Sequence, residues 1–191
     1  SRPRLYVLDG GKALTAAVRT HAGVAALIQR CQVHKRRNVL GHLAEEHQPG
    51  VSAKLNAAYA LEDYDKAKAA LEQLHRQLMD LNPSAARSLA EGMMETLTVH
   101  RLHMPAQLRL TLASTNVIES AFSVVETVCG NVKRWHGGDQ RERWVGSGLL
   151  VAEEQFRRVK GYKQIPVLLK EMETALAKSS GIVVAKRKKA A

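Results

Sequence analysis

The stretch Leu5-Tyr6-Val7-Leu8-Asp9-Gly10-Gly11 decides how the sequence is interpreted. Its first four residues form a short apolar, β-prone run, and the glycines after Asp9 indicate a turn. A helix is expected directly afterwards, from Lys12 to Thr20. This order of strand, turn and helix places Asp9 at the carboxyl end of a strand, where open α/β sheets gather ligands and catalytic groups.

The segments that follow predict one more strand and then helices. Residues 24–28 are apolar and are expected to form the neighbouring strand, and the spacing of Val33, Leu40 and Leu43 predicts a helix. Gln48-Pro49-Gly50 is expected to close this N-terminal part.

The middle of the chain is expected to be entirely helical. Residues 62–81 carry one apolar stripe, formed by Tyr64, Ala67, Leu71, Leu74, Leu78 and Leu81. Asn82-Pro83-Ser84 is expected to end that helix, with Ser84 capping the next one, Ala85 to Leu97. Further helices are expected at 114–129, 141–160 and 166–177, and the basic tail 178–191 is expected to be disordered.

Charge indicates a polyanionic partner. The chain has 191 residues and a net charge of +11. Residues 1–44 carry +7, residues 45–98 carry −4 and residues 99–191 carry +8, so two basic segments flank an acidic one. A basic excess of this size favours nucleic acid, because neutralising phosphates releases counterions.

Other features exclude several protein classes. The sequence has no apolar run of transmembrane length and no secretory signal pattern. Its two cysteines, Cys31 and Cys129, do not form a disulfide framework, which suits a reducing cytosol. A strand so close to Ser1, with no initiator Met, leads us to expect a fragment that begins inside a fold.

A second candidate carboxylate lies in Ser114-Thr115-Asn116-Val117-Ile118-Glu119-Ser120. On a helix, Asn116, Glu119, Ser120 and Ser123 form a polar stripe, and Ile118, Phe122, Val125 and Cys129 form an apolar stripe beside it. This arrangement would hold Glu119 rigidly, as a metal ligand requires. Alternatively, Asn116 and Glu119 form a capping box. For Asp9 the corresponding alternative is a turn or helix-capping role.

Two further segments carry candidate binding groups. Cys31 and His34 have half of a zinc pattern, but no second ligand pair follows, so Cys31 is expected to be a buried core residue. His34 and Asn38 share a helix face beside a cationic patch, which suits contacts to DNA or support of a metal carboxylate. In residues 131–136, Lys133 and Arg134 can hold phosphates. The neighbouring Trp135 and Trp144 can stack on a base or anchor the core, and the core is favoured for Trp144.

Several motifs in order resemble the Mutator family of insertion-sequence transposases. The matching segments are Val7-Leu8-Asp9-Gly10, residues 29–39 with Gln29-Arg30-Cys31 and His34, residues 114–120, Asn131-Val132-Lys133-Arg134-Trp135, and Phe156 to Tyr162. The resemblance covers nearly the whole chain except the tail. Glu126 and Gly130 depart from it, because the family usually has a basic residue near each of these positions.

The resemblance implies a mostly helical α/β chain with a partial RNase H-like fold. A catalytic segment, 1–44, would be followed by an all-helical insertion, 45–113, by C-terminal catalytic helices, 114–177, and by the tail, 178–191. Asp9 and Glu119 would be the second Asp and the Glu of an Asp-Asp-Glu triad that binds two Mg²⁺ or Mn²⁺ ions. The first Asp would lie upstream of Ser1. The residues expected to contact DNA are His34, Lys35, Arg37, Asn38, Asn116, Lys133 and Arg134.

The implied function is transposition of an insertion sequence by metal-dependent DNA cleavage and strand transfer. Partners would be double-stranded DNA at the transposon ends and the target DNA, with a homo-oligomer in the full-length protein. The expected location is the bacterial cytoplasm, at the nucleoid. The alternative is a non-catalytic, basic nucleic-acid-binding helical module; a Cys/His metal-binding regulator is a weaker one. Only the transposase requires Asp9 and Glu119 to share an ion position.

We predict that this chain alone does not cleave DNA: three carboxylates offset most of the charge of two divalent ions, whereas two leave the metal site underpopulated. The measurement is a nicking assay with transposon-end DNA and Mg²⁺. Measurable metal-dependent cleavage by these 191 residues would contradict the prediction.

Overall fold

The computed structural model describes the backbone of residues 3–23 and 26–188, and side chains as far as residue 178. Two compact units are present: unit 1 comprises Ser1–Ser114 and Lys160–Ala191, and unit 2 comprises Thr115–Val159. The expected segments 1–44 and 45–113 therefore belong to the same compact unit, while the expected segment 114–177 is divided between the two units.

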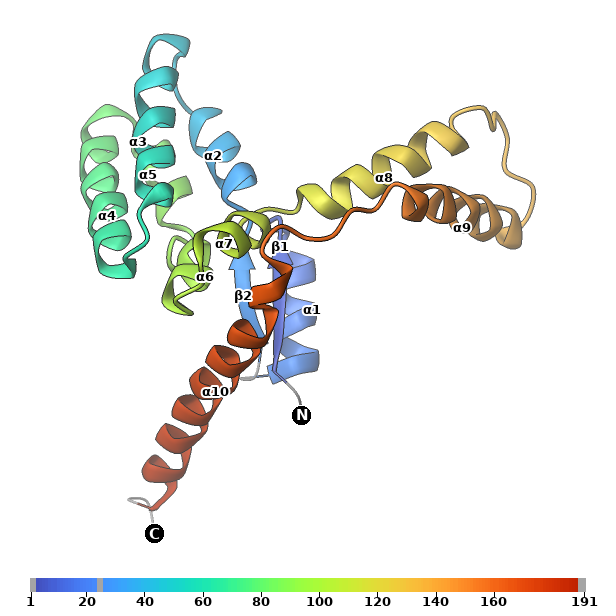
Figure 1. Cartoon of the computed structure of the whole chain (residues 1–191). Coiled ribbons are helices and arrows are strands. Elements are labelled where there is room, and N and C mark those ends of the chain that lie inside the picture. The colour runs from blue at the N-terminus through green and yellow to red at the C-terminus, as the bar shows by residue number, and fades with distance from the viewer. Residues whose placement is uncertain (1–2, 24–25, 189–191) are drawn as a thin grey trace. The chain divides into compact units, whose positions relative to one another are not determined.

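Unit 1 contains a two-stranded parallel sheet (Figure 1). Strand β1, Arg4–Leu8, pairs with β2, Ala26–Arg30, and helix α1, Lys12–Ala22, joins them. Parallel strands need such a crossover connection. The predicted strand, turn and helix are confirmed. The second strand is shifted: it extends to Arg30, while residues 24 and 25 lie outside the described part of the chain.

Side-chain hydrogen bonds link β2 to the segment 96–99. The Gln29 amide donates to the Thr96 carbonyl at 2.8 Å and accepts from the Val99 N–H at 3.0 Å. The Thr98 hydroxyl donates to the Ile28 carbonyl at 2.6 Å. Gln29 is fully buried, so these bonds satisfy polar groups that would otherwise be costly. They attach the segment around Thr96 to the sheet.

A helical block completes most of unit 1. Its elements are α2 Gln32–Leu40, η2 Glu45–His47, α3 Gln48–Ala60, α4 Tyr64–Leu81, α5 Pro83–Ala90, η3 Met94–Leu97, α6 Thr98–Arg101 and α7 Ala106–Leu112. The apolar stripe predicted for residues 62–81 is confirmed in α4, where Ala67, Leu71, Leu74 and Leu78 are buried in one core cluster. Leu81 is the exception, at 43% exposed.

Three predicted helix ends differ from the structure. Gln48-Pro49-Gly50 begins α3, because proline fits the first helical turn. Asn82 caps α5 in place of Ser84: its side-chain oxygen accepts from the Ser84 and Ala85 N–H groups. The helix predicted to reach Leu97 stops after Ala90, since Gly92 adopts a φ of +64°.

The C-terminal part of unit 1 returns to the sheet. After η4, Tyr162–Gln164, helix α10, Ile165–Lys188, contributes Leu168 and Met172 to a second core cluster with Leu27, Val99, Leu102, Met104 and Leu108. The predicted end at Ala177 is wrong, because the helix continues to Lys188; no proline follows Pro166 to interrupt its backbone bonds. The tail 178–191 was expected to be disordered, but its backbone is helical as far as Lys188, and residues 189–191 lie outside the described part.

Unit 2 is a pair of helices, α8, Asn116–Cys129, and α9, Gly138–Glu154. Within its two helices, the buried residues are Ala121 and Val125 of α8 and Gly148 and Ala152 of α9. A Cβ on Gly148 would lie 2.9 Å from the Val125 Cα, so the helices approach closely at this glycine. The predicted apolar stripe is therefore correct at Val125 but wrong at Ile118 and Phe122, which are about half exposed.

The coarse prediction of a mostly helical α/β chain is confirmed by the two parallel strands and the many helices. Among the helices that the structure describes, none combines the length and apolar character needed to cross a membrane.

We predict that Gly148→Ala destabilises unit 2 by about 1–3 kcal/mol, because the new methyl group must displace the Val125 backbone. Gly146→Ala is the matched control: the same substitution in the same helix meets no atom within 4 Å. That control should gain up to about 1 kcal/mol from helix propensity. Amide hydrogen exchange of residues 116–154 measures both changes. Equal protection in the two variants would contradict the close helix contact.

Candidate active site and nucleic-acid interface

Asp9 lies where the sequence places it, directly after β1 and before α1. It is exposed, and one carboxylate oxygen accepts a hydrogen bond from the Gly11 N–H at 2.8 Å. The turn role considered as an alternative is thus real for that oxygen. Among the described residues, no hydrogen bond is formed by the other oxygen, so Asp9 retains one oxygen for a ligand.

The end of β2 brings a buried arginine beside this turn. The Arg30 guanidinium lies against Gly10 and Gly92: a Cβ added to either would come within 2.7 Å of it. Both glycines have positive φ angles, +106° and +64°, which other residues rarely adopt. Arg30 donates to the Glu91 carboxylate at 3.1 Å, and this hydrogen bond lowers the pKa of Glu91.

The sequence analysis assigned no role to Arg30 or Glu91. The one available signal was Gly92, a glycine inside a predicted helix, which indicates a break or a close approach.

Cys31 and His34 form a pair in the first turn of α2. Cys31 is fully buried, as expected, and its N–H donates to the Leu8 carbonyl at 2.7 Å. The His34 Nδ1 lies 3.3 Å from the Cys31 sulfur. Within the described residues of unit 1, no third Cys, His, Asp or Glu lies within metal-ligand distance of this pair.

The structure corrects the prediction made for Lys35. It was expected to contact DNA, but its side chain is fully buried. Its Nζ donates to the Ser88 carbonyl at 2.6 Å and to the Glu91 carbonyl, where helix α5 ends. Carbonyls at a helix end lack intrahelical partners and carry partial negative charge, so they attract an ammonium group. Lys35 is therefore a structural residue that joins α2 to α5.

Arg37 and Asn38 are exposed on α2, as a DNA contact requires. They line an open hollow of about 670 Å³ together with His42 and Arg87. Arg87 belongs to the acidic segment, so regional charge gave no reason to select it. Two arginines from different helices thus face one hollow, which suits the phosphates of a nucleic acid.

In unit 2, Glu119 is half buried in the first turn of α8 and accepts a hydrogen bond from the Thr115 hydroxyl. The capping-box alternative is wrong, because Thr115 rather than Asn116 is the N-cap residue and Glu119 is then one position too far along. Asn116 is exposed as the first residue of the helix.

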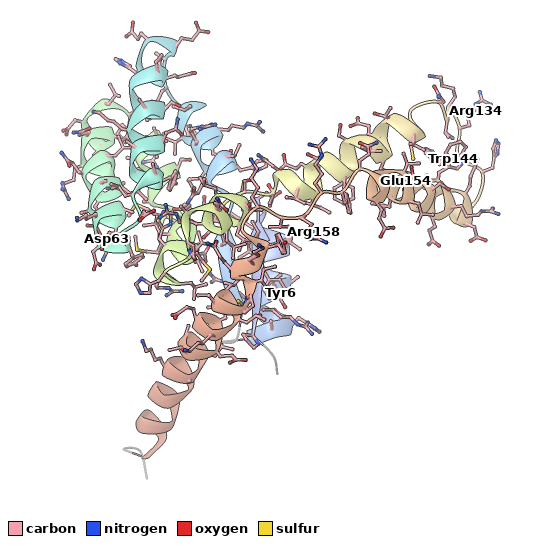
Figure 2. The ribbon with its side chains drawn as sticks, viewed as in Figure 1. Tyr6, Asp63, Arg134, Trp144, Glu154 and Arg158 are labelled. Carbon is pink, nitrogen blue, oxygen red and sulfur yellow. The ribbon has the colours of Figure 1, made fainter. Side chains whose placement is uncertain are left out.

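The basic segment between α8 and α9 presents Lys133 and Arg134 to solvent. Figure 2 shows Arg134 where the chain turns from one helix to the other, with Trp144 on the second helix. Trp144 is 38% exposed, so the expectation that it anchors a core is only partly met. Asp9 belongs to unit 1 and Glu119 to unit 2, and their sharing of an ion position stays a prediction.

Comparison with known proteins identifies the family. A model of the Mutator family of transposases matches residues 3–133, which include both Asp9 and Glu119. The chain belongs to this family.

Named relatives agree with that assignment. The chain is 32% identical to the transposase for insertion sequence element IS6120 of Mycolicibacterium smegmatis, over 64% of this chain and 37% of the relative. It is 35% identical to the ISRM5 transposase of Rhizobium meliloti, over 52% of this chain and 27% of that one. It is 28% identical to the IST2 transposase of Acidithiobacillus ferrooxidans, over 82% and 51%. The matches thus span about half or less of each relative's length, and no solved structure matches significantly.

We predict that the buried Lys35 makes stability rise with pH above about 8. Burial, aided by the nearby positive charge of Arg30, lowers the pKa of Lys35 from 10.5 to about 8. Between these two pKa values the unfolded chain binds more protons than the folded chain, so the free energy of unfolding increases with pH. Below pH 8 Lys35 is charged in both states, and the free-energy cost of burying its charge is then fully present.

The measurement is urea unfolding between pH 7 and 10, for the natural chain and for Lys35→Met. The variant should lose this rise, whereas Lys54→Met, at an exposed position on α3, should keep it. A rise of the same size in Lys35→Met would contradict the assignment.

Proposed function

We propose that the chain is part of a transposase of RNase H-like fold and carries two of its catalytic carboxylates, Asp9 and Glu119. The observation that carries the proposal is the position of Asp9, exposed at the carboxyl end of a parallel strand with one oxygen available. Active-site groups gather at this edge in α/β proteins. Membership of the Mutator family supports the same role for both residues.

The two carboxylates suit Mg²⁺ or Mn²⁺, which prefer oxygen ligands. Gly11 orients the Asp9 carboxylate through its N–H, and Thr115 orients that of Glu119 through its hydroxyl. Two such ions, when bound, would activate the attacking water or 3′-hydroxyl and stabilise the leaving oxygen. The role of the chain itself is to hold its carboxylates in place, since rigid support of ligands decides how well such sites work.

The proposed DNA contacts lie on both units. Arg37 and Asn38, joined by Arg87, line the hollow on α2 and α5, and His34 lies on the same helix. In unit 2 the exposed groups are Asn116, Lys133 and Arg134. The proposed partners are transposon-end and target DNA, met by a homo-oligomer of the full-length protein at the bacterial nucleoid.

The rival proposal is a non-catalytic nucleic-acid-binding module. It is favoured by the hollow beside Arg37 and Arg87 and by the basic segment between α8 and α9, taken alone. It requires nothing of Asp9 and Glu119. The two proposals therefore differ in what happens when a carboxylate is neutralised: DNA binding should persist in both cases, but only a transposase should lose DNA cleavage.

We predict that Asp9→Asn or Glu119→Gln, in the full-length protein that contains this chain, lowers DNA cleavage by about a hundredfold or more. Even residues that only support a metal ligand contribute about 10–100-fold. Glu126→Gln is the control for Glu119, as an exposed carboxylate on the same helix, and Asp65→Asn is the control for Asp9. The measurement is Mg²⁺-dependent cleavage of transposon-end DNA, with DNA binding measured alongside.

Full cleavage by Asp9→Asn or Glu119→Gln would remove these residues from the active site. DNA binding by the full-length protein without any metal-dependent cleavage would favour the non-catalytic module.

A further inference from the structure

We infer that the cavity between the first turns of α1 and the buried Arg30 binds one phosphate of the DNA backbone, with Lys12 and Arg30 as its principal ligands. This inference rests on the proposed function in that it takes DNA as the polyanion. The cavity has a volume of about 350 Å³ and lies wholly within unit 1. It is separate from the hollow beside Arg37.

An unsatisfied buried donor marks the cavity as a binding site. Arg30 is 7% exposed and lines the cavity. Its Nη2 donates to Glu91, but within the described residues its Nε–H has no hydrogen-bond partner. A buried donor left unpaired costs stability, and a guanidinium offers a fork of donors that matches phosphate oxygens. An anion oxygen in this cavity would satisfy the Nε–H.

The charges around the cavity leave a positive excess. Lys12, Arg19 and Arg30 line it, against Glu91 and Glu95. Arg19 is paired with Glu95 and Arg30 with Glu91. Glu91 is also shared with the buried Lys35, at 3.8 Å. Lys12 makes no ion pair with any described residue, so its charge is available to a ligand.

The backbone at the cavity also suits an anion. Helix α1 starts here with Gly11 as its N-cap; the Gly11 N–H is bonded to Asp9, but the N-cap residue has no side chain to cap the first helical turn. The N–H groups of a first helical turn have no intrahelical partners and lie at the positive end of the helix dipole. Gly10 packs closely against Arg30 at this cavity, since a Cβ on it would lie 2.5 Å from the Arg30 Nε. The helix terminus and the unpaired Arg30 Nε are independent features of the same cavity.

The lining favours a backbone phosphate over a nucleotide. None of the residues that line the cavity is aromatic, so there is no surface on which a base could stack. The Arg19 side chain is 61% exposed, so the cavity opens to solvent, where a continuous strand can pass. Since Gly10 directly follows Asp9, a strand held here would also lie next to the proposed catalytic carboxylate.

The test measures the salt dependence of DNA binding by the 191-residue chain, without divalent metal, using fluorescence anisotropy and a labelled duplex. For duplex DNA, each neutralised phosphate contributes about 0.9 to the slope of log K against log salt. Lys12→Gln should therefore reduce the slope by about one contact. Lys66→Gln is the matched control, an exposed lysine in the first turn of α4, and should leave the slope unchanged.

A second measurement separates the possible ligands. Inorganic phosphate, at constant ionic strength, should raise the melting temperature of the natural chain more than that of Lys12→Gln. Stabilisation by phosphate with an unchanged DNA slope in Lys12→Gln would mean a free-phosphate site and would overturn the DNA assignment. An unchanged slope without stabilisation, or no DNA binding by the natural chain, would overturn the site itself. Because neither measurement requires cleavage, failure here leaves the test of Asp9 and Glu119 unaffected.

Discussion

The buried ammonium of Lys35, donating to the carbonyls at the end of α5, is the interaction on which the arrangement of unit 1 depends. Together with the hydrogen bond from Arg30 to Glu91, it joins the carboxyl edge of the sheet to the helical block. Removing the ammonium would leave two carbonyls of a helix end unpaired, and removing Glu91 would leave two buried cations without their shared partner. A strongly basic segment and an acidic one are thereby held as one compact unit.

In this arrangement the acidic segment need not oppose the proposed DNA binding. Glu91 is paired with Arg30 and Lys35, and Glu95 is paired with Arg19. Part of the negative charge of the acidic segment is therefore neutralised within unit 1. Other members of the same segment, such as Arg87, face the basic hollow. Net charge by region therefore describes the partner class of the whole chain better than the role of a particular segment, because pairing within the fold decides which charges remain for a ligand.

Predictions succeeded where one local pattern was sufficient. The stripe in α4 and the run before Asp9 were recognised because periodicity and turn residues reflect backbone geometry directly. Predictions from the sequence failed at Gln29 and Lys35, where a polar residue is buried. Gln29 ends the apolar run in sequence, yet it belongs to β2 because Thr96 and Val99 satisfy its amide. Lys35 was predicted to be a surface cation because the helical spacing of its segment places it on one face of a helix. That spacing does not show which other segment covers the face.

The sequence by itself determined the family, the parallel β-α-β start, the position of Asp9 after its strand and the helical character of the rest, since these depend on residue order and short-range geometry. Only the tertiary structure decided that Lys35 is buried, that Arg30 lies between Gly10 and Gly92, and that Gly148 lets two helices approach closely. Each of these depends on a contact between segments far apart in the chain, and no local pattern records which distant group will satisfy a buried donor or fill the space beside a glycine.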